Sequence, residues 1–284
     1  MKLRTLAVML LTGLAVAQAP PASSQPPAST APSTTAEPQG KGPIQAKTQA
    51  EYDAYGVAHA KTENATEMEQ AAADFATKFP DSDLRVLLYR DAMHAYQRDN
   101  NADKMLEMGR QVLKLAPDDP EAMLGVAEVL TERTKDTDLD KDQRLQEAEK
   151  LAKHALETID TGTVVPAGTS AERLEAYKNF LRSNAYSIIG TQEYNKDNYK
   201  DAEEAFRKSI DAYPSQLDPI VVLRLALALD QQKKYDEALK EANHAVELTE
   251  EGTTVGTYAR QERDRLLILV PGAQKPAPPA PAKK

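Results

Sequence analysis

The chain has 284 residues, a formal net charge of −9 and no cysteine. The absence of cysteine excludes disulfides, zinc–thiolate sites and a cysteine nucleophile. The acidic balance argues against nucleic acid as a partner, because phosphate backbones attract basic surfaces, whereas cationic surfaces of other proteins remain possible partners.

The first 17 residues have the pattern of a secretory signal peptide. Lys2 and Arg4 precede a short apolar run at 6–16, and residues 15–17 (AVA) form a small-x-small cleavage site. The run is too short for a transmembrane helix; a retained N-terminal anchor is the alternative. We therefore expect an exported protein, periplasmic or secreted and bacterial in origin, that is not inserted in a membrane after cleavage.

Proline-rich segments flank the middle of the chain. Residues 18–45 contain seven prolines among Ala, Ser, Thr and Gln, with Ile44 the one large apolar residue. Such a segment buries too little surface to offset its ordering entropy, so we expect a disordered linker. The end of the chain, 271–284, repeats this composition and is expected to be a disordered tail. A polyproline ligand for a partner is the alternative for the tail.

Between these segments, residues 46–270 are predicted to be all-α. Apolar side chains recur at spacings of three and four, and nothing alternates with period two over a long stretch. One such helical stripe consists of Tyr199, Ala202, Phe206, Ile210 and Tyr213.

The predicted helices come in similar pairs. The stretch NYKDA at 198–202 is followed 36 residues later by KYDEA at 234–238. Pro80 and Pro117 each follow a helical stretch and lie 37 residues apart. Recurrence at near-fixed spacing indicates internal repeats of about this length.

These repeats resemble the tetratricopeptide (TPR) family, whose pattern is W-x2-L-G-x2-Y, then A-x3-F, then P. In the best copy the matching residues are Tyr186 (in place of Trp), Ile189, Gly190, Ala202, Phe206 and Pro214. This copy departs from the pattern at Glu193, where the family has Tyr, and the other copies match less well. The resemblance implies a right-handed α-solenoid of stacked antiparallel helix pairs. The expected copies are 49–82, 86–119, 120–160 with an insertion, 183–216 and 219–252, followed by a capping helix at 254–270.

The insertion in the third copy contains the acidic stretch DTDLDKDQRLQE. Its carboxylates have the spacing of an EF-hand calcium loop; they are Asp136, Asp138, Asp140, Asp142 and Glu147. Lys141 stands where that loop needs Gly for a sharp turn, and Gln143 replaces an apolar residue. The favoured interpretation is an elongated turn in which Asp140 caps the next helix and Gln143 completes a capping box. Calcium binding is kept as a weak alternative.

No catalytic motif is found in the sequence. It has no nucleophile elbow, phosphate-binding glycine loop or His-Glu-x-x-His, and its four histidines are far apart. We therefore expect a non-catalytic protein without a cofactor.

The TPR resemblance implies a scaffold or adaptor that binds a protein or peptide partner in the concave groove built by the first helices. The residues placed there are Arg90, His94, Gln97, Leu124, Glu128, Asn184, Ser187, Thr191, Tyr194, Leu223 and Leu227. Leu223 and Leu227 have an alternative role, which is packing against the capping helix. An envelope enzyme or chaperone with a site between repeats is the alternative function, and a cleft that joins His94 to buried acids would favour it.

Overall fold

The computed structural model describes residues 44–166, 168–270 and 272. The predicted signal peptide, the linker up to residue 43 and the tail from residue 273 lie outside this part. The described residues form eleven α-helices and no strand longer than an isolated bridge, so the prediction of an all-α fold is confirmed. The helices are α1 Gln49–His59, α2 Ala65–Lys78, α3 Leu84–Arg98, α4 Ala102–Leu115, α5 Pro120–Arg133, α6 Lys141–Gly162, α7 Ala171–Asn195, α8 Tyr199–Ala212, α9 Pro219–Gln231, α10 Tyr235–Glu247 and α11 Thr254–Leu269.

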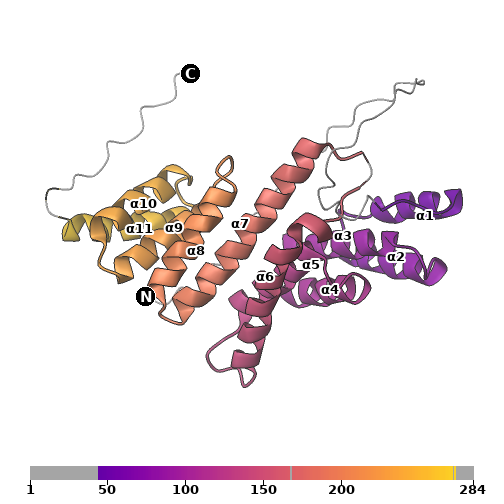
Figure 1. Cartoon of the computed structure of the whole chain (residues 1–284), viewed down its shortest axis with the longest axis horizontal. Coiled ribbons are helices and arrows are strands. Elements are labelled where there is room, and N and C mark those ends of the chain that lie inside the picture. The colour runs from indigo at the N-terminus through magenta and orange to yellow at the C-terminus, as the bar shows by residue number, and fades with distance from the viewer. Residues whose placement is uncertain (1–43, 167, 271, 273–284) are drawn as a thin grey trace, which may run out of the picture.

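The helices stack in one elongated row (Figure 1). Each helix packs against the next one along the chain, which gives five antiparallel pairs from α1/α2 to α9/α10. The last helix, α11, covers α9 and α10. The predicted stack of helix pairs is therefore confirmed. Within the described residues, no helix combines the length and hydrophobicity that a membrane span needs.

Local signals in the sequence explain where most helices begin. Side-chain oxygens of Ser, Thr, Asn and Asp accept backbone N–H groups of the first turn, which would otherwise lack partners. These caps are Thr48, Asn64, Asn101, Asp119, Ser170, Asp218 and Thr253. Proline occupies the first position of α5 and α9, where no backbone donor is lost.

The described part of the chain begins slightly before the predicted repeats. Ile44, at the end of the predicted linker, forms an isolated parallel β-bridge with Pro166. Its side chain packs against the core of the first two helix pairs. This contact joins the start of the described chain to the connection between α6 and α7.

The spacing within a helix pair depends on small residues, and Gly190 of α7 is the clearest example. A Cβ atom at this position would lie 2.7 Å from the ring of Phe206 on α8, which is closer than carbon atoms approach. Phe206 is fully buried. The Gly and Phe of the best repeat copy are therefore in direct contact.

We expect Gly190→Val to destabilise the protein by about 2–3 kcal/mol, because the added side chain forces α7 and α8 apart. Gly56→Ala is the matched control: Gly56 also lies in a helix, but a Cβ atom added there would have nothing within 4 Å. It should gain about 0.5–1 kcal/mol from helix propensity. Urea unfolding of both variants measures the two effects, and unchanged stability in Gly190→Val would contradict this close packing.

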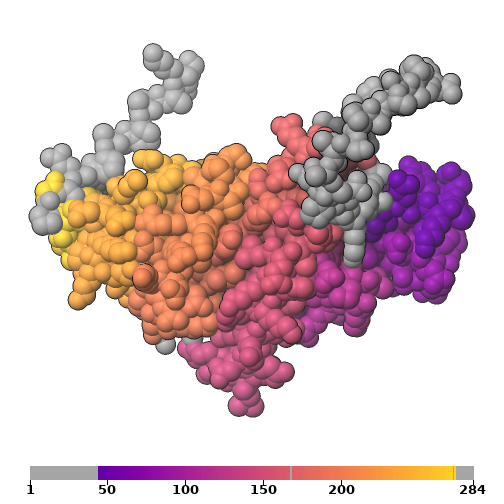
Figure 2. Space-filling model, viewed as in Figure 1, coloured from indigo at the N-terminus to yellow at the C-terminus, as the bar shows by residue number. Residues whose placement is uncertain are grey.

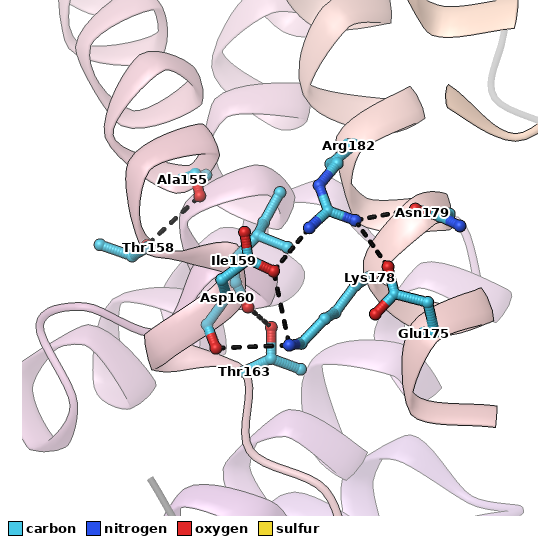
Figure 3. Close-up of polar contacts among 9 residues, drawn as sticks. All are labelled: Ala155, Thr158, Ile159, Asp160, Thr163, Glu175, Lys178, Asn179 and Arg182. Atoms are coloured by element: carbon cyan, nitrogen blue, oxygen red, sulfur yellow. Dashed lines mark hydrogen bonds and ion pairs between the residues drawn. The ribbon is translucent and has the colours of Figure 1, made fainter. Parts of the chain in front are cut away.

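α6 and α7 are held together firmly at one end (Figure 3). Near the end of α6, Asp160 accepts a 2.5 Å hydrogen bond from Arg182 of α7 and lies 3.4 Å from the amine of Lys178. Arg182 also donates to Asn179 at 2.7 Å. α7 is longer than the predicted copy, which starts at 183, and its first three turns supply part of this contact. The two helices are antiparallel, so their other ends are the start of α6 and the end of α7.

Candidate partner-binding site

Six of the predicted groove residues are buried and serve the fold instead of an open surface. They are Arg90, Leu124, Ser187, Thr191, Tyr194 and Leu223. Leu124 lies in the core between α5, α6 and α7. Leu223 packs with Ala245 of α10 and Ala259 of α11, so the alternative prediction of packing against the capping helix is correct for this residue. The partly exposed residues of the set are His94, Gln97, Glu128, Asn184 and Leu227.

Arg90 and His94 are brought together by Glu121 of α5. Arg90 donates to the Glu121 carboxylate at 2.7 Å and to the carbonyl of Val164 at 2.9 Å, and His94 Nε2 lies 2.5 Å from the same carboxylate. Burial alone would raise the pKa of Glu121, but the charges of Arg90 and His94 outweigh it and hold that pKa well below its usual range. Because Arg90 and His94 of α3 both pair with Glu121 of α5, this cluster acts as a clamp that holds α3 and α5 together.

The enzyme alternative calls for a cleft that joins His94 to buried acids, and His94 does pair with the carboxylate of Glu121. Glu121 is ionised and bound on two sides, so it has little capacity left to accept a substrate proton. The two cavities described below are lined by other residues and not by His94.

A cleft of about 780 Å³ opens between the start of α6 and the end of α7. One wall consists of residues 131–135, at the end of α5 and the start of the elongated turn. The other walls are residues 141–149 of α6 and 191–196 of α7. The turn and the start of α6 form the magenta projection at the lower edge of the molecule in Figure 2. The start of the elongated turn and the first turns of α6 therefore line two sides of the cleft.

Internal bonds hold the walls of this cleft in place. The Gln192 amide and the Thr131 hydroxyl are 3.0 Å apart and share a hydrogen bond between α7 and α5. Lys196 at the end of α7 pairs with Glu149 of α6 at 2.8 Å. Because each bond joins two walls, the cleft is preformed.

The lining offers both donors and acceptors of hydrogen bonds. Gln146 and Asn195 contribute exposed amides. The Thr134 hydroxyl is buried and has no hydrogen-bond partner among the described residues. Thr134 also adopts an extended conformation and makes no capping bond to α5, which leaves carbonyls of the last turn without a backbone cap. Leu145 is the one large apolar side chain among the described residues of the lining.

A second, much smaller cavity of about 20 Å³ lies on the other side of the last turn of α5. It shares Glu132 and Arg133 with the cleft. Two of the predicted groove residues, Gln97 and Glu128, line this cavity together with Asn100.

Glu128 makes no hydrogen bond or ion pair with another described residue. Burial raises its pKa from 4.5 to about 7, and the nearby charges of Glu132 and Asp218 add to the rise. Arg224 acts in the opposite direction but does not outweigh them. Glu128 is therefore an acid whose charge the surrounding chain does not balance.

Arg224 of α9 connects three helix pairs near this cavity. It donates to Glu132 of α5 at 2.5 Å and to the hydroxyl of Thr191 on α7 at 2.9 Å. The predicted groove residue Thr191 therefore helps to hold Arg224, and it is the one predicted groove residue that also lines the cleft.

The acidic stretch is arranged differently from a calcium loop. Asp136 pairs with Lys141 at 3.1 Å, Asp138 accepts the backbone N–H of Lys135, and Glu147 pairs with Arg110 of α4. In the described part of the chain, no group of three or more acidic or histidine side chains is placed to hold a metal.

Asp140 is the N-cap residue of α6, as predicted, but its side chain makes no capping hydrogen bond. The predicted capping box with Gln143 is therefore wrong. Lys141, the first residue of α6, instead bonds through its backbone N–H to the carbonyl of Asp138.

Sequence reasoning missed most of the cleft, including Gln146, Gln192, Asn195 and Lys196. These residues lie at helix ends, whereas the repeat pattern points to the inner faces of first helices. The signal available in the sequence was the insertion in the third copy, which indicated that the connection between its two helices is longer than in the other copies.

Comparison with solved structures finds several similar chains, two of which are described here. No protein-family model and no curated protein sequence matches the chain. A thermophilic TPR protein of Thermus thermophilus is 14% identical, with a TM-score of 0.47 over 77% of this chain and 99% of its own. An assembly chaperone of RpL4 is 12% identical, with a TM-score of 0.40 over 76% of this chain and 96% of its own. The class of the protein, an all-α stack of helix pairs with a preformed polar cleft, follows from its own structure.

Proposed function

We propose that this protein is a non-catalytic scaffold that binds an extended polypeptide segment of a partner protein in the cleft between α5, α6 and α7. The observation that carries the proposal is the mixed lining of that cleft. A polypeptide main chain presents one N–H and one C=O per residue, so it needs donors and acceptors together. The amides of Gln146 and Asn195 and the uncapped end of α5 supply both.

Other ligand classes fit the cleft less well. Its volume of about 780 Å³ is in the usual range of ligand sites. The described lining contains no aromatic side chain on which a nucleobase could stack. The net charge of −9 also disfavours nucleic acid. A short stretch of extended polypeptide remains the best match to the shape and chemistry.

The proposed setting is the bacterial envelope, which is supported by the signal-peptide pattern at 1–17 and by the absence of cysteine. N-terminal sequencing of the protein isolated from the periplasmic fraction tests this. A mature N-terminus near residue 18 is the expected result, and recovery of the full chain in the cytoplasm would contradict it.

Selection from a phage-displayed library of random peptides of about 12 residues tests the binding function. We expect the wild-type protein to enrich specific peptides, because the preformed walls offer fixed bonding groups. Gln146→Trp should reduce binding of these peptides at least about tenfold by filling the cleft. The matched control is Gln143→Trp, which is exposed on the same helix but does not line the cleft. The proposal is wrong if no peptide is enriched, or if Gln146→Trp binds as the wild type does.

A further inference from the structure

The small cavity beside α5 has the size of one small polar group. Its volume of about 20 Å³ is only slightly larger than the space that a single water molecule needs. A lysine ε-ammonium is similar in size to a water molecule and carries three donors, whereas the planar guanidinium of arginine is larger.

The lining of this cavity is rich in oxygen. It includes the carboxylates of Glu128 and Glu132 and the amides of Gln97 and Asn100. Glu132 is already bound by Arg224 at 2.5 Å. Arg133, the cation in the lining, donates to Asn100 at 2.8 Å. Glu128 is left as the carboxylate that no hydrogen bond or ion pair of the described chain satisfies.

A partly buried carboxylate without a hydrogen bond or ion pair costs stability, so its presence calls for a compensating group. A cation supplied by a ligand would provide that compensation. The position is suitable, because Glu132 and Arg133 belong to both the cavity and the cleft. A polypeptide held in the cleft therefore passes one turn of α5 away from Glu128.

We propose that the cavity lined by Gln97, Glu128 and Glu132 receives the ε-ammonium of a lysine from the polypeptide bound in the neighbouring cleft. This inference rests on the proposed function, because the lysine belongs to the bound segment. It makes the site selective for lysine-containing segments, with Glu128 as the residue that recognises the ammonium.

The test uses the peptides enriched by the wild-type protein. We expect lysine to be over-represented at one position among them. A synthetic peptide of this sequence should lose about tenfold or more in affinity, measured by calorimetry, when that lysine is replaced by Nε-acetyl-lysine, because a charge-assisted hydrogen bond is lost. The arginine version should also bind more weakly, because the cavity is small.

Protein variants identify the recognising residue. In Glu128→Gln, the lysine and acetyl-lysine peptides should bind with nearly equal affinity. The control Glu63→Gln removes an exposed acid in the turn between α1 and α2 and should retain the wild-type preference. Circular dichroism checks that both variants are folded.

The outcomes separate the two proposals. If no peptide is enriched, the proposed function itself fails. Peptides that bind in the cleft without a lysine preference, or with a preference that Glu128→Gln leaves intact, would overturn the lysine proposal while the scaffold function stands.

Discussion

At pH 8, the free energy of unfolding of the Glu128→Gln variant is expected to be about 2–3 kcal/mol higher than that of the wild-type protein, so the variant is the more stable of the two. Burial and the nearby Glu132 raise the pKa of Glu128 from 4.5 to about 7, so the folded state holds this proton more strongly than the unfolded chain does. The wild-type protein therefore loses stability as pH rises from about 4.5 to about 7, by up to about 1.4 kcal/mol for each pH unit. Glutamine is neutral throughout and avoids this loss.

Urea unfolding at pH 4.5 and pH 8 measures the effect. The difference between the variant and the wild type should be small at pH 4.5 and reach its full size at pH 8. Other titrating groups such as His94 are present in both proteins, so their contributions largely cancel. An equal difference at both pH values would show that the charge of Glu128 is not its source.

Arg90→Met is expected to have the opposite effect and to destabilise the protein by about 3–5 kcal/mol. The substitution leaves the ionised Glu121 buried without its main partner, and removing one partner of a buried pair is far more costly than replacing both. The carbonyl of Val164 also loses the hydrogen bond that Arg90 donates. Thermal and urea unfolding at pH 7 provide the measurement.

The double variant Arg90→Met/Glu121→Met tests this explanation. Its loss of stability should be smaller than the sum of the two single losses by about 1 kcal/mol or more, because the residues interact directly. Arg110→Met is a surface control, since its pair with Glu147 is exposed and should contribute less than about 1 kcal/mol. Additive losses at Arg90 and Glu121 would contradict a shared clamp.

The helix pairs could be predicted from the sequence because their signals are local. Capping residues, prolines at helix starts and the repeated spacing of Ala202 and Phe206 each depend on a few neighbouring positions. The repeat pattern did not predict the start of α7, because it carries no position before residue 183, although Ser170 provides a local cap for this helix. Ala171–Arg182 is helical as an extension that binds Asp160 of α6.

The candidate site was only partly predictable. The repeat pattern assigned Gln97 and Glu128 to one groove without pairing them, and in the structure both line the small cavity beside α5. It could not show that Leu223 is covered by α11, because that depends on how the last helix folds back. The cleft depends on the angle between α6 and α7 and on the length of the turn between α5 and α6, which are properties of tertiary packing.

The bonds of Arg224 have a consequence for the mechanical behaviour of the array. In a simple repeat stack each unit interacts only with its neighbours, so unfolding can start anywhere and spread unit by unit. Arg224 links α9 to α5, past the pair that lies between them. The third, fourth and fifth pairs are thereby coupled and should open together under a stretching force. The cleft lies within this coupled segment and the small cavity lies at its edge, so the coupling helps to keep their walls in place.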